Sequence, residues 1–412
     1  MPESPLPPAW RDLYAPDYLA LPRRGFLEAM TAAGVAAAVA AGARRARAAA
    51  ADPVVRIGYI PITDATALLV AHAKGFFRDE GLEAAQPTLM RGWAPLVESF
   101  AADRVNLVHF LMPIPIWMRY GNGFPVKIVA WAHTNGSGIV VGRTSGITSF
   151  RDFGGKQVAV PFWYSMHNIV LQYALRAAGI KAVIRPQGAP LAADECNLQI
   201  MPPPDMPPAL AAGKLDAYIV AEPFNALGEL RAGARMLRFT GDIWKHHPCC
   251  VACVREDLTR DNAEWTQRVV NATVRGAIYA SQNKREVARL LSRDGAGYLP
   301  VPADVVERAM LAYDEPGYRE TGAIRHAEWG AGRIDFQPWP YPSATELMVR
   351  LMRETEVGGD AGFLGRLDPT FVARDLVDYG PVRRAVERFP EWARDPGVNR
   401  GDPFAREEVL TL

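Results

Sequence analysis

Residues 55–83 constrain the fold of this chain more than any other stretch, because they hold a strand, a turn and a helix in one short segment. Residues 55–60 form an apolar run rich in β-branched and aromatic side chains, which predicts a strand. Pro61 closes the run, since it cannot donate to a sheet ladder. Thr63 and Asp64 then stand where an N-cap belongs, before a helical pattern. Because a helix start beyond a strand offers free N–H groups, both residues are candidates for ligand binding as well as for capping.

The succession of strand, helix and strand occurs twice along the chain. It is first seen over residues 55–110 and again over residues 155–220, with short links between the elements. This pattern predicts two α/β units, each with a parallel sheet covered by helices on both faces. Residues 249–254 read as a further strand that returns to the first unit.

These patterns divide the chain into four parts. We assign residues 51–141 and 251–357 to a first lobe, residues 142–250 to a second lobe, and residues 358–412 to a helical extension that packs on the first lobe. The chain then crosses between the lobes twice, which predicts a hinge.

Residues 1–50 have the pattern of an export signal. Arg23 and Arg24 precede a short, weakly hydrophobic run, more arginines and a stretch of small residues. This order is typical of a twin-arginine signal peptide, and it predicts a mature protein in the periplasm. The alternative is an amphipathic surface helix on a cytosolic protein.

The charge balance bears on the kind of partner. The chain has 46 basic and 45 acidic residues, for a net charge of +1, so it carries no electrostatic signature of nucleic-acid binding. We expect a small-molecule ligand and a monomer.

Residues 71–82 (AHAKGFFRDEGL) carry a family resemblance. The apolar helix, the Lys-Gly-Phe-Phe turn and the charged pair resemble the opening of periplasmic solute-binding proteins of the nitrate/sulfonate/bicarbonate (taurine-type) ABC-transporter family. Further matches at residues 216–223, 242–248 and 336–351 extend the resemblance over most of the chain. The resemblance implies a type II periplasmic binding protein, with two Rossmann-like lobes, a ligand cleft and two hinge crossings. It also implies that an ABC permease and an ATPase subunit are the partners.

The resemblance also indicates where a ligand site would lie. Trp93 stands at the position of a ligand-contacting Trp, and Asn135 stands where nitrate-binding relatives have a Gln. Val160, Ala221 and Cys250 replace a His, a Gly and a Lys of those relatives, so the cationic part of an oxyanion site is missing. Because an uncompensated buried ion costs several kcal/mol, nitrate itself is disfavoured. A small organic or other oxyanion ligand of the same class is expected instead.

Aromatic and polar residues near the predicted strand ends complete the expected ligand site. For the aromatic members, packing in the core is the competing interpretation, and Glu222 before Pro223 could simply cap a helix. The predicted ligand-binding residues are Thr63, Asp64, Trp93, Phe110, Asn135, Trp163, Tyr164, Ala221, Glu222 and Cys250.

Residues 246–253 contain the densest group of metal-ligating side chains, namely His246, His247, Cys249, Cys250 and Cys253. Strand geometry opposes a single site, because Cys249 and Cys253 would share one face while Cys250 points to the other. We therefore predict buried free cysteines and no cofactor. A strained disulfide between Cys249 and Cys250 is a second alternative.

Enzyme signatures are otherwise missing from the sequence. There is no P-loop, no nucleophile elbow, no H-E-x-x-H zinc motif and no dinucleotide fingerprint. The predicted protein is therefore not an enzyme. The alternative function is a metal-dependent enzyme resembling the thiamine-pyrimidine precursor synthases of the same fold, which would use residues 246–253. The export signal argues against this alternative.

Overall fold

The computed structural model describes residues 53–395 and 397–412, together with residue 10. The predicted export signal, with Arg23 and Arg24, lies outside these residues. In the part of the chain that is described, no helix has the length and apolar character needed to cross a membrane.

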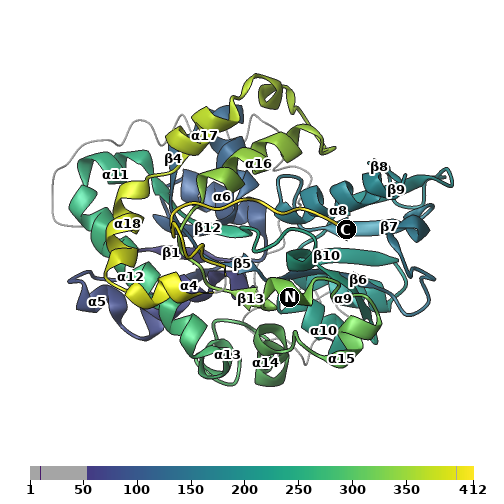
Figure 1. The fold of residues 1–412 in the computed structure, drawn as a ribbon, viewed down its shortest axis with the longest axis horizontal. Helices are drawn as coiled ribbons and strands as arrows, with labels where there is room; N and C mark the ends of the chain where they lie inside the picture. The colour runs from purple at the N-terminus through teal and green to yellow at the C-terminus, as the bar shows by residue number, and fades with distance from the viewer. Residues whose placement is uncertain (1–9, 11–52, 396) are drawn as a thin grey trace, which may run out of the picture.

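Two sheets organise the molecule, and they lie side by side as the centres of two α/β bodies (Figure 1). The first sheet has the strand order β2–β1–β3–β12–β4. Its strands are β1 (Ile57–Tyr59), β2 (Thr88–Leu89), β3 (Leu107–Leu111), β4 (Val126–Trp131) and β12 (Cys250–Arg255). β1 pairs in parallel with β2 and β3, whereas β12 runs antiparallel to β3 and β4.

The second sheet has the strand order β11–β6–β10–β7–β9–β8. Its strands are β6 (Ser137–Val141), β7 (Gln157–Val160), β8 (Lys181–Val183), β9 (Glu195–Ile200), β10 (Ala217–Ala221) and β11 (Arg235–Phe239). β10, β7, β9 and β8 are parallel, while β6 is antiparallel to both of its neighbours. The prediction of parallel sheets therefore holds within each βα unit. It is wrong for the strands that carry the chain into and out of the second body.

Helices cover the sheets, as the spacing of apolar residues predicts. The helices are α4 (Thr66–Ala73), α5 (Phe76–Asp79), α6 (Trp93–Ala101), α7 (Pro113–Ile116), α8 (Met166–Ala177), α9 (Met206–Ala211), α10 (Phe224–Arg231), α11 (Glu256–Asp261), α12 (Ala263–Gln282), α13 (Lys284–Leu291), α14 (Ala303–Leu311), α15 (Pro316–Glu320), α16 (Pro342–Arg353), α17 (Pro369–Leu376) and α18 (Tyr379–Glu387). The long helix α12 packs closely on α4. A Cβ at Gly276 would lie only 2.2 Å from the carbonyl oxygen of Ala67. Glycine at this position lets the two backbones approach.

The chain passes between the two bodies along two adjacent segments. β6 already belongs to the second sheet, so residues 137–141, which we assigned to the first lobe, are part of the second body. The crossing lies between β4 and β6, where the two-residue strand β5 (Thr134–Asn135) pairs with β13 (Ile334–Asp335). The return lies between β11 and β12. The predicted crossing was several residues too late, because the apolar run of β6 was counted with the first sheet.

The C-terminal part of the chain, residues 354–412, contacts both bodies. α18 packs on α12 and β4 of the first body. Residues 354–363 then lie against α8 of the second body, where Gln172 donates to the Glu356 carbonyl at 2.8 Å. The final residues run across the molecule, shown in yellow in Figure 1, and Leu410 forms a β-bridge with Trp244. We call residues 354–363 and 397–412 the C-terminal arm.

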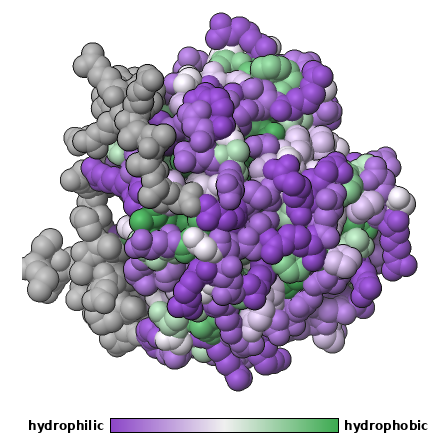
Figure 2. All heavy atoms as spheres, turned by 90° about the vertical axis from the view of Figure 1, so that its left-hand side faces the viewer, coloured by the Kyte–Doolittle hydropathy of each residue, from purple (hydrophilic) through white to green (hydrophobic). Residues whose placement is uncertain are grey.

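The outer face of the first body is mostly hydrophilic. Figure 2 shows apolar side chains there only in small, separate patches. Most large apolar side chains are instead buried in one continuous core.

Candidate functional site

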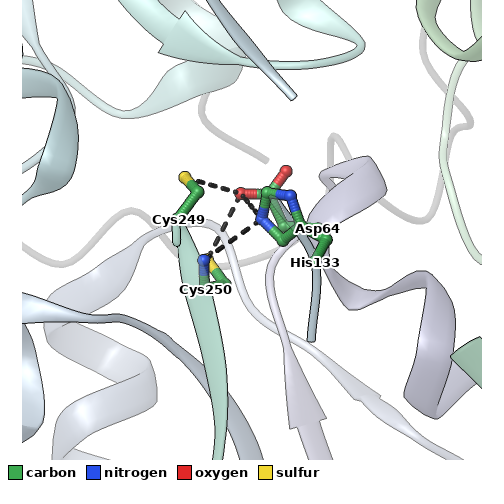
Figure 3. Close-up of side chains that lie close together, drawn as sticks. All are labelled: Asp64, His133, Cys249 and Cys250. Atoms are coloured by element: carbon green, nitrogen blue, oxygen red, sulfur yellow. Dashed lines mark hydrogen bonds and ion pairs between the residues drawn. The ribbon is translucent and has the colours of Figure 1, made fainter. Parts of the chain in front are cut away.

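Asp64 is the centre of a buried group of side chains at the junction of the two bodies. It lies in the 3-10 turn η1 (Thr63–Ala65) after β1, and its Oδ2 atom is 2.9 Å from His133 Nε2. The thiols of Cys249 and Cys250 reach the same oxygen at 3.6 and 3.2 Å (Figure 3). We call these four residues the Asp64 cluster. One potential ligand atom from each lies within 4.8 Å of those of the others, and all four side chains are buried.

The two crossings hold three members of this cluster in place. His133 follows the end of β4, and Cys250 begins β12. The backbones of the crossings are hydrogen-bonded to each other, since Ala132 N donates to the Cys250 carbonyl at 2.9 Å and Asn135 N donates to the His247 carbonyl at 3.0 Å. Because the crossings run side by side, residues more than a hundred positions apart in the sequence meet at Asp64.

The surroundings of His133 favour its charged form. Burial by itself would lower its pKa, but the negative charges of Asp64 and Cys249 raise it to about 10. An imidazolium donates from both ring nitrogens. Nε2 faces Asp64, while Nδ1 has no hydrogen-bond partner among the residues described.

His109 and Trp93 present two further N–H groups without an acceptor. Backbone N–H of Ile60 donates to His109 Nε2 at 3.1 Å, so the proton of this ring is on Nδ1. Burial lowers the pKa of His109 to about 3, and this ring is therefore neutral. Its ring centre lies 5.4 Å from that of Trp93. Within the described chain, neither His109 Nδ1 nor Trp93 Nε1 has a partner.

The second body contributes His167 at the start of α8. Its Nε2 lies 2.9 Å from the hydroxyl of Ser137, which is itself 3.7 Å from the Cys249 thiol. Burial, followed by the charges of His247 and His133, lowers the pKa of His167 to about 3. Its Nδ1 is a further buried atom that no described residue contacts by a hydrogen bond.

Five buried polar atoms of the side chains described so far lack a partner in the described structure. They are Asp64 Oδ1, Trp93 Nε1, His109 Nδ1, His133 Nδ1 and His167 Nδ1. We call them the unpartnered set. A buried polar group left unpaired costs about 1–3 kcal/mol, so a concentration of such groups indicates a place that a bound polar molecule completes. Trp93, His109 and His133 offer donors, and Asp64 offers an acceptor.

Thr63 and Glu222 meet at the junction, but through the backbone of Glu222. The amide and the hydroxyl of Thr63 donate to the Glu222 carbonyl at 2.8 and 3.1 Å. The Glu222 carboxylate accepts from Arg333 at 2.7 Å and from Ala226 N at 3.0 Å. It is thus occupied by internal partners, like a helix cap. The capping prediction is wrong for Thr63 and Asp64, because Ala65 is the N-cap residue of α4 and no side chain caps that helix.

Three predicted aromatic residues have contacts of their own elsewhere in the structure. Phe110 is fully buried against Phe100, with ring centres 5.4 Å apart, as the core-packing interpretation expects. The Tyr164 hydroxyl donates to the Asp360 carbonyl at 3.1 Å, and the Trp163 indole lies against Gly358. These two side chains support the C-terminal arm.

The remaining predicted positions are placed as follows. Ala221 is the last residue of β10 and is buried. Asn135 has a positive φ of 59°, which Asn tolerates better than most residues. Its side-chain NH2 donates to Asp335 at 3.0 Å, and its Oδ1 has no partner among the residues described.

The run 246–253 does not form a single metal site. His246 Nε2 contacts the Trp329 carbonyl at 3.2 Å, and His247 Nε2 contacts the Thr240 hydroxyl at 2.7 Å. Cys253 is buried farther along β12. Only Cys249 and Cys250 reach Asp64, and the expectation that they point to opposite faces is wrong. Cys249 precedes β12, so the alternation of a strand does not govern it.

Sequence reasoning missed His109 and His133 and did not select His167. A signal was available for His109, because it alternates with Phe110 along β3. If Phe110 faces the core, its neighbour faces the other side of the sheet. His133 carried no such signal, since it lies in a turn-rich link whose path depends on the crossing.

Comparison with known proteins agrees with this architecture. Residues 48–292 match the NMT1-like family. A nitrate/nitrite binding protein of Nostoc sp. is 26% identical over 312 residues, covering 70% of this chain and 67% of the relative. A bicarbonate transport ATP-binding protein of Synechococcus elongatus is 28% identical over 288 residues, covering 65% of this chain but only 42% of the relative. This chain therefore spans less than half the length of that second relative.

The fold itself is known from solved structures. The crystal structure of the periplasmic nitrate-binding protein from Synechocystis PCC 6803 covers 87% of this chain and 93% of its own, with a TM-score of 0.69 and 19% identity. The relatives named here are binding or transport proteins, and the enzyme alternative is not favoured. Since the family match spans more than half of the residues, the chain belongs to the NMT1-like family, and its resemblance to the substrate-binding proteins of nitrate, sulfonate and bicarbonate importers is confirmed.

Proposed function

We propose that this chain is the periplasmic solute-binding component of an ABC importer and that it captures a small oxyanion at the junction of its two bodies. It delivers the solute to a permease driven by an ATPase subunit, acts as a monomer and performs no catalysis. The names of the nitrate/nitrite and bicarbonate transport relatives support a solute of this class. Twin-arginine export through Arg23 and Arg24 is part of the same proposal.

The observation that carries the proposal is the set of unpartnered donors. Trp93, His109 and His133 each hold a buried N–H group with no acceptor in the part of the chain described. Hydrogen-bond donors can stabilise a desolvated anion without a lysine or arginine. The missing cationic side chain at Cys250 therefore does not exclude an oxyanion.

Asp64 narrows the class of oxyanion. Its unpartnered Oδ1 atom needs a donor. Bicarbonate and amino- or hydroxy-sulfonates can accept from the three N–H groups and also donate to Asp64. Nitrate has only acceptors, so it would leave this oxygen unpaired, and we expect it to bind more weakly.

Isothermal titration calorimetry of the mature protein with bicarbonate, taurine, an unsubstituted alkyl sulfonate and nitrate tests this function. We expect saturable binding of a donor-bearing oxyanion. Trp93→Phe should weaken it about tenfold or more, because loss of one hydrogen bond to a charged group costs about 1.5–3 kcal/mol.

Trp131→Phe is the matched control. Trp131 also has a buried indole N–H without a described partner, but its ring packs on Tyr341, with centres 5.5 Å apart, on the side of the C-terminal arm. The Trp131→Phe variant should bind the solute as tightly as the wild type does. Equal losses in the two variants, or no binding of any anion, would refute the proposed site.

A further inference from the structure

The Asp64 cluster has the composition and packing of a metal centre. We propose that Asp64, His133, Cys249 and Cys250 bind one thiophilic divalent metal ion, with Zn²⁺ as the best fit. All four side chains have a relative exposure of 0%, and they come from three separate segments of the chain. Figure 3 shows the two thiols and the imidazole turned toward the same carboxylate oxygen.

The separations between the ligand atoms suit a tetrahedral site. Zinc holds sulfur at about 2.3 Å and nitrogen or oxygen at about 2.0–2.2 Å, which places ligand atoms about 3.3–3.8 Å apart in a tetrahedron. The observed separations from Asp64 Oδ2 are 2.9, 3.2 and 3.6 Å, and no pair exceeds 4.8 Å. Side-chain rotations that move each atom by less than about 1 Å would therefore complete the coordination sphere.

The hydrogen bonds within the cluster do not satisfy its polar atoms. His133 Nε2 lies 2.9 Å from Asp64 Oδ2 and 3.2 Å from the backbone N–H of Cys250. If His133 Nε2 carries a proton, it cannot accept the hydrogen bond from Cys250 N. If it carries none, its lone pair faces a lone pair of the Asp64 carboxylate. Meanwhile Asp64 Oδ1 and His133 Nδ1 are fully buried and have no partner among the described residues. A cation between Nε2 and Oδ2 removes the repulsion between these two lone pairs.

The chemistry of the donors selects the metal. Two thiolates and an imidazole favour zinc and similar transition ions, whereas Ca²⁺ and Mg²⁺ require more oxygen ligands than this cluster holds. Four protein ligands leave no open coordination position, which is typical of a structural ion. The Ser137 hydroxyl, 3.7 Å from Cys249 Sγ, is placed to donate to a metal-bound thiolate.

Such an ion would tie the turn after β1 to both crossings. It would bind His133 through Nε2, which leaves the Nδ1–H group available to a solute. The metal and the proposed solute would share Asp64 and His133 but contact different atoms of each, so the two proposals are tested by separate measurements.

Metal analysis of the purified full-length protein, followed by removal of metal under reducing conditions and titration with Co²⁺, tests the proposal. We expect about one zinc ion per chain and the visible absorption of tetrahedral thiolate-bound Co²⁺. Cys250→Ser should lower Co²⁺ affinity by about tenfold or more. Cys253→Ser is the matched control, because it changes a buried cysteine of the same strand outside the cluster, and it should keep wild-type affinity.

A second measurement uses only the wild-type protein, so it does not depend on whether a variant folds. Chelation should lower the thermal midpoint of the wild type, and Zn²⁺ but not Mg²⁺ should restore it. Protein without metal that gives no thiolate–Co²⁺ absorption, a Cys249–Cys250 disulfide in the protein as purified, or equal affinity losses in Cys250→Ser and Cys253→Ser would each overturn the metal site. Calorimetry of the metal-free protein with bicarbonate and taurine tests the solute proposal separately.

Discussion

Arg333 is a fully buried cation that joins the end of β10 to the segment before β13. It donates to Glu222 Oε1 at 2.7 Å and to Glu229 Oε2 at 2.8 Å. Arg333→Met keeps much of the apolar stem but removes the charge. The variant leaves the carboxylate of Glu222, whose side chain has 0% exposure, without its cation.

The expected loss of stability is large. Removing one partner of a buried ion pair costs about 3–5 kcal/mol, because the other charge remains desolvated. The total free energy of unfolding of a domain is only about 5–15 kcal/mol. We expect Arg333→Met to lose about 3–5 kcal/mol at pH 7.5, and the double variant Arg333→Met, Glu222→Gln to recover much of that loss.

The deficit should depend on pH with a defined sign. Burial raises the pKa of Glu222 even in the presence of Arg333, and loss of Arg333 raises it further. The folded variant then holds a proton that the unfolded chain releases above its ordinary pKa of about 4.3. The destabilisation is complete above the folded pKa and fades as the pH falls toward the unfolded one. We expect a deficit about 1–2 kcal/mol smaller at pH 5.5 than at pH 7.5.

Urea unfolding followed by tryptophan fluorescence at the two pH values measures both effects. Arg260→Met is the control, since Arg260 is paired with Asp261 at 2.8 Å on the open surface. This control should unfold like the wild type at either pH. The reasoning is refuted if Arg333→Met behaves like the control, or if its deficit grows on acidification.

Three further substitutions test the packing described above. Gly276→Ala puts a Cβ 2.2 Å from the Ala67 carbonyl oxygen, so it should cost about 1–3 kcal/mol in urea unfolding, whereas Gly317→Ala, which meets nothing within 4 Å, should cost nothing. Phe404→Ala removes a ring 4.7 Å from that of Trp339, and we expect faster cleavage of the C-terminal arm in limited proteolysis; wild-type cleavage would contradict the packing of the arm. Tyr164→Phe deletes the hydrogen bond to the Asp360 carbonyl, so the variant should lose about 0.5–1.5 kcal/mol of stability in urea unfolding. Its solute affinity should be unchanged, and a loss of affinity would mean that Tyr164 is part of the ligand site.

Local patterns in the sequence were sufficient for most of the fold. The apolar run 55–60 contains β1 (Ile57–Tyr59), and the helical spacing after Thr63 becomes α4 (Thr66–Ala73). These predictions succeed because the burial of one face of a strand or helix produces a periodic pattern of apolar residues within a short stretch of sequence. The crossing was misplaced because the apolar sequence pattern of a strand such as β6 does not indicate which of the two sheets the strand joins.

The Asp64 cluster could not be assembled from local patterns. Cys249 and Cys250 were noticed together with the histidines beside them, yet their partners are Asp64 and His133, which other segments supply. The spacing of residues along one segment predicts which of its side chains share a face. It does not predict which residues of a distant segment lie opposite that face. Asp64 was selected for its place before a helix, and the structure shows that His133, Cys249 and Cys250 lie around it.

The pairing of the two crossings also has a mechanical consequence. Hydrogen bonds from Ala132 to Cys250 and from Asn135 to His247 make the connection a ribbon two strands wide. A ribbon bends most readily about a line that lies in its plane and runs across its strands. Rotation of one body against the other about that line would keep the bonds between the crossings, but it would have to break or carry along the bonds between Gln172 and Glu356, where the C-terminal arm is attached to the second body.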